Sequence, residues 1–174
     1  MDFQQARFNM VEQQIRPWDV LNFDLLDALE SIPREKFVQK NQQGYAYADT
    51  SLTLPNGGRM LEPKIVARMI QGLSLTKTDR VLEVGTGSGY ATAVLATLAR
   101  SVRTFDTDGT QQALAKSALQ QLEFDNIQYQ IGDGLAAQDE RYDAIYIGGA
   151  LREVPEVLLQ SLNDGGRMVV VVGG

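Results

Sequence analysis

The sequence predicts an α/β fold in which a doubly wound parallel sheet follows an N-terminal helical extension. Beyond Pro63, short apolar runs rich in β-branched residues alternate with segments whose apolar residues recur at helical spacing. Such alternation is typical of a parallel sheet whose two faces are covered by right-handed crossovers. A turn with three glycines directly follows the first of these strands, as in the βαβ units that bind nucleotides.

The second half of the chain supplies the elements of this sheet. A helix begins at Pro63, because proline suits the first helical position. The strands are expected in the order 3-2-1-4-5, and the fifth leaves an edge that proteins normally cover or pair. Either a partner covers this edge or the natural protein continues into later strands absent from this chain, and we favour the second. Strands are expected at residues 80–84, 101–105, 127–131, 143–147 and 167–171, and helices at 89–99, 110–122 and 155–162.

Residues 1 to about 40 are expected to form helices. Apolar residues recur at helical spacing up to Ile15, and Pro17 stops this first helix. A second helix runs from about Asn22 to just before Pro33, and a short turn follows at residues 33–37. Large aromatic side chains in this region are expected to pack in the core, namely Trp18, Phe23 and Phe37.

Residues 41–63 form a segment that is too rich in glycine and proline for a helix and too long for a simple connection. Long loops beside a nucleotide-binding fold often build the substrate side of the site. The sequence leaves two interpretations open for this segment, an ordered surface loop with a short strand or the substrate side of a site.

The glycine turn is Gly85-Thr86-Gly87-Ser88-Gly89, and its spacing distinguishes between nucleotides. A dinucleotide-binding fingerprint has its third glycine three residues after the second, where this chain has Tyr90. Here glycine recurs at every second position, and an acid, Glu83, stands two residues before the first glycine. Methyltransferases that bind S-adenosylmethionine use this form, because their ligand carries a methionine carboxylate and ammonium in place of a pyrophosphate. We therefore expect a Rossmann-like class I methyltransferase fold; a turn without a ligand and a nicotinamide site are the alternatives.

The residues that follow the other strands favour the same ligand. In open α/β sheets the ligand lies outside the carboxyl ends of the strands, where the strand order reverses. Asp106 follows the second strand, where a carboxylate can accept both ribose hydroxyls, and Asp133 follows the third, where it can reach the adenine amino group. Gly148-Gly149-Ala150 follows the fourth strand and leaves space beside a ligand. The predicted cofactor-binding residues are Glu83, Gly85, Thr86, Gly87, Ser88, Gly89, Asp106, Asp133 and Gly134.

The composition excludes several other classes of chemistry. The net charge of −6 argues against a general binder of nucleic acid. The absence of cysteine and histidine excludes disulfides, thiolate nucleophiles, Ser-His-Asp triads and most metal sites, and we expect no metal. No signal peptide or membrane span is found in the sequence, so a cytoplasmic protein without a membrane partner is expected. The sequence does not predict an oligomeric state.

Several motifs together resemble the protein-L-isoaspartate O-methyltransferase family. They lie at residues 10–14, 33–38, 46–49, 81–90, 132–134 and 142–145, and cover nearly the whole chain in order. The resemblance implies an enzyme that methylates the isoaspartyl α-carboxylate of a protein or peptide substrate, and so starts its repair. It also implies that residues 1–62 supply N-terminal helices and a substrate-side loop, while residues 63–174 form the domain that binds S-adenosylmethionine.

One stretch departs from the family pattern. The family has a hydroxyl residue two positions before the proline, beside the substrate carboxylate, and this chain has Leu61. Arg59 and Glu62 stand where the family has threonine and glutamine. Arg59 either pairs with the substrate carboxylate or neutralises Glu62, and we favour the second. An alternative function is therefore a cofactor-binding homologue with weak or no isoaspartyl activity, which acts on another acceptor or as a sensor or scaffold.

The catalytic residues cannot be assigned from the sequence. The sulfonium of S-adenosylmethionine already activates the methyl group, so a carboxylate acceptor needs no base. A hydroxyl or amine acceptor would need one, and in a chain without histidine the candidates are Asp49, Glu62 or a tyrosine.

Overall fold

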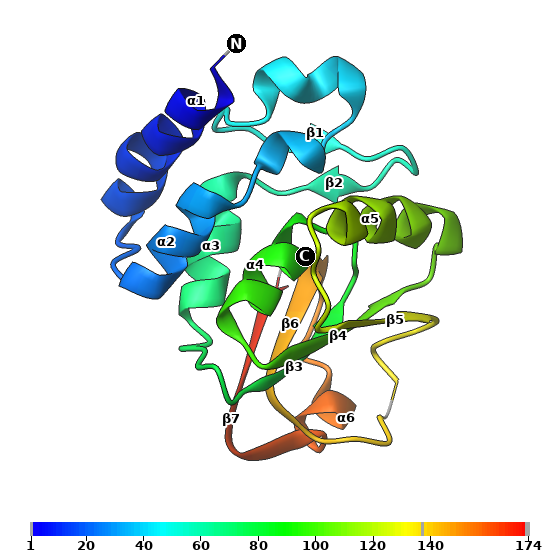
Figure 1. The fold of residues 1–174 in the computed structure, drawn as a ribbon. Helices are drawn as coiled ribbons and strands as arrows, with labels where there is room; N and C mark the ends of the chain where they lie inside the picture. Colours follow the sequence, from blue (N-terminus) through cyan, green and yellow to red (C-terminus); the bar gives the residue numbers. More distant parts are fainter. Residues whose placement is uncertain (1, 137, 173–174) are drawn as a thin grey trace.

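A five-stranded parallel sheet forms the centre of the computed structural model (Figure 1). Its strand order is β5-β4-β3-β6-β7, which confirms the predicted order 3-2-1-4-5 when these strands are counted from one. The order reverses at β3, which pairs with β4 on one side and β6 on the other. The strands are β3 (Arg80–Val84), β4 (Ser101–Asp106), β5 (Ile127–Ile131), β6 (Tyr142–Leu151) and β7 (Leu162–Val172).

The structure describes residues 2–136 and 138–172. Met1, Ala137, Gly173 and Gly174 lie outside the described residues, so the two glycines that close the predicted cofactor domain receive no structural account. Within the described part of the chain, no helix is both long and apolar enough to cross a membrane.

Three helices cover one face of the sheet, while the opposite face carries only the short α6 among the described residues (Figure 1). Side chains alternate between the faces, because successive residues of a strand point to opposite sides. Val81 and Ala144 therefore join the large core under the helices, while Leu82 and Ile145 join a smaller cluster with Leu158. The helices are α3 (Pro63–Gln71), α4 (Tyr90–Leu98), α5 (Gly109–Gln121) and α6 (Glu156–Leu159).

The last two strands are longer than predicted. β6 continues through Gly148 to Leu151, so the small residues expected after the strand lie within it. The predicted helix at residues 155–162 is wrong beyond Leu159, and β7 already begins at Leu162. The β6–β7 ladder tolerates this length because its register shifts twice, and Gly165 has a φ of +76°. Bulges of this kind keep a strand in the sheet across residues that would otherwise end it.

The first N-terminal helical segment extends slightly beyond its predicted end, whereas the second helix lies within its predicted bounds. α1 (Phe3–Met10) continues as a π-helical segment (Val11–Ile15) and a 3₁₀ turn (Arg16–Trp18), so the helical segment ends after Pro17. α2 (Phe23–Ser31) is capped by the Asn22 side chain, which accepts a hydrogen bond from the Leu25 amide at 3.0 Å.

Of the three aromatic residues predicted to pack in the core, only one does so. Phe37 is buried, but Trp18 is 45% exposed and Phe23 is 78% exposed. Trp18 packs at the surface under the ammonium of Lys64, which lies 4.4 Å from the centre of the ring. Phe23 lies away from the apolar stripe of α2, whose buried leucines are Leu25, Leu26 and Leu29.

The segment after α2 contains little regular structure, as predicted. It forms two 3₁₀ helices (Arg34–Lys36 and Lys40–Tyr45) and a short antiparallel hairpin of β1 (Leu52–Thr53) and β2 (Arg59–Met60). Figure 1 shows the hairpin close to the helical layer, near α5 and the start of α4. The N-terminal part and the sheet thereby share one core cluster.

Gly134 packs where the ends of three strands meet, and Gly134→Ala should destabilise the fold. An added Cβ would lie 2.8 Å from the Phe105 Cβ and 3.0 Å from a Val84 methyl. Such overpacking costs about 1–3 kcal/mol, which chemical denaturation can measure. Gly149→Ala is the control, because its Cβ would meet nothing within 4 Å. Equal stability of the two variants would contradict this packing role.

Candidate active site

The glycine turn lies at the carboxyl end of β3 and leads into α4. Gly85, Gly87 and Gly89 all have positive φ, at +94°, +55° and +89°. A Cβ on Gly85 would meet nothing within 4 Å, and one on Gly87 would meet only Leu54 at 3.7 Å. A Cβ on Gly89 would lie 3.0 Å from the Ala115 Cβ. The first two glycines therefore leave open space in front of the turn, and the third lets α4 pack closely on α5.

Side chains from β4 and α5 hold the centre of this turn. The Gly87 amide donates to Asp106 Oδ2 at 3.0 Å, and the Gly87 carbonyl accepts from Gln111 Nε2, also at 3.0 Å. Asp106 Oδ1 accepts from the Asp108 amide at 2.9 Å. Because an ionised carboxylate has about four acceptor positions, Asp106 retains capacity for hydroxyl groups of a ligand.

Glu83 is fully buried next to the turn. It also contributes to the lining of a small cleft that lies at the turn. Its Oε1 atom accepts from Thr92 and, at 2.7 Å, from Thr104. Its Oε2 atom is buried and has no hydrogen-bond partner among the described residues. The pKa of Glu83 is raised to about 8, chiefly by burial and to a smaller extent by the nearby charge of Asp106, and against the lowering effect of the two threonine hydroxyls. The carboxyl group is therefore mostly protonated at pH 7.

The side chains of the two hydroxyl residues in the turn support its structure. Thr86 is buried, and its hydroxyl lies 2.7 Å from that of Thr104. Ser88 Oγ accepts from the Tyr90 amide at 3.1 Å at the start of α4. If Thr86 or Ser88 contacts a ligand, we therefore expect its backbone, and not its side chain, to make the contact.

The ends of β5 and β6 complete the site. Asp133 is exposed just beyond β5, and its Oδ1 accepts from the Leu135 amide at 2.9 Å. Gly134 is packed beneath it against Phe105. β6 passes so close to the glycine turn that a Cβ on Gly148 would lie 3.3 Å from the Gly85 carbonyl oxygen. The structure thus brings the predicted cofactor-binding residues to one edge of the sheet, although their roles toward a ligand stay predictions.

A small cleft separates this edge from the stretch that departs from the family pattern. Leu61 and Arg59 line it on one side, and the turn and Glu83 line it on the other. Tyr90, Tyr146 and Gly148 also contribute to its walls.

Of the three charged candidates for catalysis, Arg59, Glu62 and Asp49, only Arg59 lines this cleft. Arg59 Nη2 donates to the Ser51 hydroxyl across the hairpin, so the expected pairing of Arg59 with Glu62 is wrong. The charge of Glu62 instead acts on Arg34, whose pKa it raises against the larger effect of burial. Asp49 pairs with Lys64 at 3.1 Å and is absent from the cleft lining, as is Glu62.

Arg34 is the residue of this site to which sequence reasoning gave no role. It is fully buried, and burial lowers its pKa. Its Nε donates to the Ala46 carbonyl at 2.7 Å, and its Nη2 donates to the Leu61 carbonyl at 3.0 Å. The guanidinium carbon also lies 4.6 Å from the ring centre of Tyr90, the first residue of α4. The motif at residues 33–38 contains this arginine, but only the fold brings its partners together.

The buried carboxyl group of Glu83 should make stability depend on pH, and Glu83→Gln should remove that dependence. Between the unfolded pKa near 4.5 and the folded pKa of about 8, the folded state keeps a proton that the unfolded state has lost. The free energy of unfolding therefore falls as the pH rises through this window, by on the order of 1.4 kcal/mol per pH unit from this group. Denaturation of both proteins from pH 5 to 9 would measure the difference. Parallel pH profiles of wild type and variant would show that Glu83 does not titrate in this way.

Comparison with known proteins identifies the family of this chain. The profile of the protein-L-isoaspartate(D-aspartate) O-methyltransferase family matches residues 6–174. The protein-L-isoaspartate O-methyltransferase of Serratia proteamaculans is 40% identical over 169 residues, which cover 96% of this chain and 81% of the relative. The enzyme of that name from Petrotoga mobilis is 37% identical over 176 residues, with coverage of 99% and 83%.

Solved structures agree with this match. A protein-L-isoaspartate O-methyltransferase superimposes with a TM-score of 0.81 at 26% identity, over 96% of this chain and 54% of that one, so this chain spans about half of its length. A Plasmodium falciparum protein described as a putative protein-L-isoaspartate O-methyltransferase shares the fold, with a TM-score of 0.79 at 18% identity, over 100% of this chain and 85% of the other. On the family profile and the curated relatives, the chain belongs to the protein-L-isoaspartate O-methyltransferase family.

Proposed function

We propose that this protein transfers the methyl group of S-adenosylmethionine to the carboxylate of an isoaspartyl residue in a protein or peptide. Membership in the family supports the reaction. The observation that carries the proposal is the cleft, in which a glycine turn with an adjacent buried acid faces the family's acceptor position at Leu61. In this proposal residues 1–62 form the substrate side, and residues 63–174 hold the cofactor.

The residues of the cleft fit S-adenosylmethionine. The buried Oε2 atom of Glu83 lacks a partner among the described residues and suits the ammonium group of the methionine part. The open space in front of Gly85 and Gly87 admits a ligand close to the backbone. Asp106 has acceptor capacity for ribose hydroxyls, and the exposed Asp133 lies where an adenine amino group is expected.

The protein residues have a limited chemical task in this reaction. When bound, the cofactor supplies a methyl group that its sulfonium already activates. An isoaspartyl carboxylate is ionised near neutral pH, so the chain needs no general base, in keeping with its lack of histidine. Met60, Leu61 and Tyr146 give the cleft apolar walls that exclude water. Arg34 fixes the Leu61 backbone relative to the start of α4, and thereby orients the acceptor against the cofactor side.

Asp106→Ala should weaken S-adenosylmethionine binding and narrow the preference for the cofactor over its 2′-deoxyribose analogue. Loss of charge-assisted hydrogen bonds costs roughly 1–3 kcal/mol. Asp106 also holds the turn through Gly87, but that loss affects both ligands equally, so the ratio of the two affinities isolates the ribose contact. Calorimetry with both ligands measures this ratio. Asp139→Ala is the control, because Asp139 pairs with Arg103 and is absent from the cleft lining. A wild type that binds both ligands equally would contradict the role of Asp106.

Leu61→Ser should raise kcat/KM for an isoaspartyl peptide. Leucine offers no hydrogen bond to the acceptor carboxylate, and an unpaired polar group in a closed site costs on the order of 1–3 kcal/mol. Because each 1.36 kcal/mol is about tenfold in rate, the serine variant should be roughly ten- to a hundredfold faster. A methyl-transfer assay measures this, with Leu21→Ser at an exposed position as the control. An unchanged rate in Leu61→Ser would show that the acceptor is held by other groups. An inactive wild type and variant, with normal cofactor binding, would instead contradict the proposed reaction.

A further inference from the structure

A second and larger hollow, of about 380 Å³, lies beside the cleft. Three elements form its walls: the 3₁₀ segments from Lys36 to Gln42, the β1–β2 hairpin, and one face of α5. We call it the lysine groove, after the two lysines at residues 36 and 40 in its lining. Its volume lies within the range of about 300–1,000 Å³ that is typical of ligand pockets.

The walls of the lysine groove are fixed by side-chain hydrogen bonds. The side-chain amides of Gln39 and Gln42 both donate to the Thr53 carbonyl, at 2.7 and 3.2 Å. These two bonds tie the 3₁₀ segments to the hairpin. Phe37 and Leu54 are buried in the lining, whereas Leu114 on α5 is 51% exposed. The groove is therefore a preformed surface of mixed polarity with an apolar floor and an accessible leucine.

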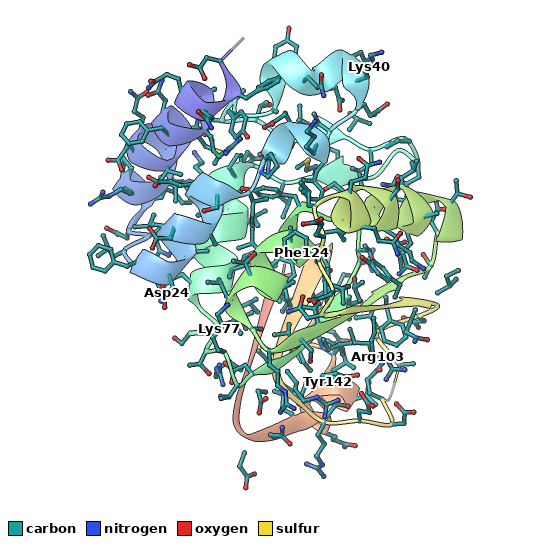
Figure 2. All side chains as sticks on the ribbon, in the orientation of Figure 1. Asp24, Lys40, Lys77, Arg103, Phe124 and Tyr142 are labelled. Atoms are coloured by element: carbon teal, nitrogen blue, oxygen red, sulfur yellow. The ribbon has the colours of Figure 1, made fainter. Side chains whose placement is uncertain are left out.

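The charges of the groove are of one sign. Lys36 and Lys40 are both exposed, and Figure 2 shows Lys40 at the edge of the molecule, on the 3₁₀ helix Lys40–Tyr45. Among the residues that the structure describes, no aspartate or glutamate belongs to the lining, although the chain as a whole carries a net charge of −6. Such a local reversal of sign favours an occupant with acidic groups, and the walls favour apolar side chains beside them.

The groove adjoins the cleft in which methyl transfer is proposed. Met60 and Ser88 line both hollows. Gln111 also lines the groove, and its side chain donates to the Gly87 carbonyl in the glycine turn. A polypeptide that presents an acceptor residue to the cleft therefore has its neighbouring residues within reach of the groove.

We propose that the lysine groove binds the segment of the substrate protein that flanks the methylated residue, and selects segments that combine acidic and apolar side chains. The acidic groups pair with Lys36 and Lys40, and the apolar side chain packs against Leu114 and the buried lining. This inference rests on the proposed function, because it assigns a substrate preference to the same reaction.

The test compares a short neutral isoaspartyl peptide with peptides extended on either side by alternating leucine and glutamate. For the wild type, at least one extension should raise kcat/KM on the order of tenfold, the effect of one buried apolar side chain or a pair of charge contacts. The double variant Lys36→Glu/Lys40→Glu should lose this gain, and should prefer an extension with lysine in place of glutamate. Leu114→Glu, at an exposed position, should lose the gain as well.

Lys116→Glu is the matched control, because Lys116 lies on α5 but outside the groove lining, near the Tyr129 ring. It should keep the full gain from the extension. A gain that survives both groove variants, or no gain from either extension, would overturn the proposal.

A binding measurement separates this proposal from the proposed function. Extended peptides with ordinary aspartate cannot be methylated in the proposed reaction, yet their extension should still bind by fluorescence anisotropy, and should bind more weakly to the double variant. Such binding without turnover of any isoaspartyl peptide would uphold the groove and contradict the reaction. Turnover of isoaspartyl peptides without any measurable contribution of the extension would uphold the proposed reaction and contradict the role of the groove.

Discussion

The backbone of Gly87 is the point on which the geometry of the site depends. Its N–H is held by Asp106 from β4, and its carbonyl is held by Gln111 from α5. A glycine turn is flexible by itself, because glycine loses more backbone freedom on folding than any other residue. The hydrogen bonds with Asp106 and Gln111 offset this loss of entropy in the folded protein, so the turn is already formed before a ligand binds. Preorganisation of this kind preserves affinity that a mobile loop would lose.

The position of the acceptor segment relative to this turn depends on a buried charge. A fully buried guanidinium is costly unless it is paired, and Arg34 is held by the carbonyls of Ala46 and Leu61 and by the ring of Tyr90, although its buried Nη1 has no hydrogen-bond partner among the described residues. These contacts use the backbone of Leu61 and leave its side chain free to vary. Replacement of the family hydroxyl by leucine therefore changes the chemistry of the cleft without changing what holds its backbone.

Much of the fold was predictable because strong local signals mark it. The bounds of β3 and β5 agree with the predicted ranges, since β3 is largely an apolar run, β5 alternates apolar residues with glutamines, and a turn ends each strand. The lengths of β6 and β7 were underestimated because glycines normally end a strand, whereas register shifts in the β6–β7 ladder accommodate them here. The position of the site followed from the rule for strand ends. Arg34 could not be assigned in this way, because its partners lie 12 and 27 residues away in the sequence.

The protonation of Glu83 links the buried acid to the ligand that the cleft is proposed to hold. A charged carboxylate without a second partner is unfavourable in this buried position, and the raised pKa keeps the group neutral at pH 7. An ammonium group beside Oε2 would favour the ionised form, so the site would release a proton and gain an ion pair when the ligand enters. The free site thus avoids an isolated buried charge, and the occupied site would contain a balanced one. A neutral glutamine could accept the same hydrogen bond but could not balance the charge, so the proposed role requires an acid at this position before the glycine turn.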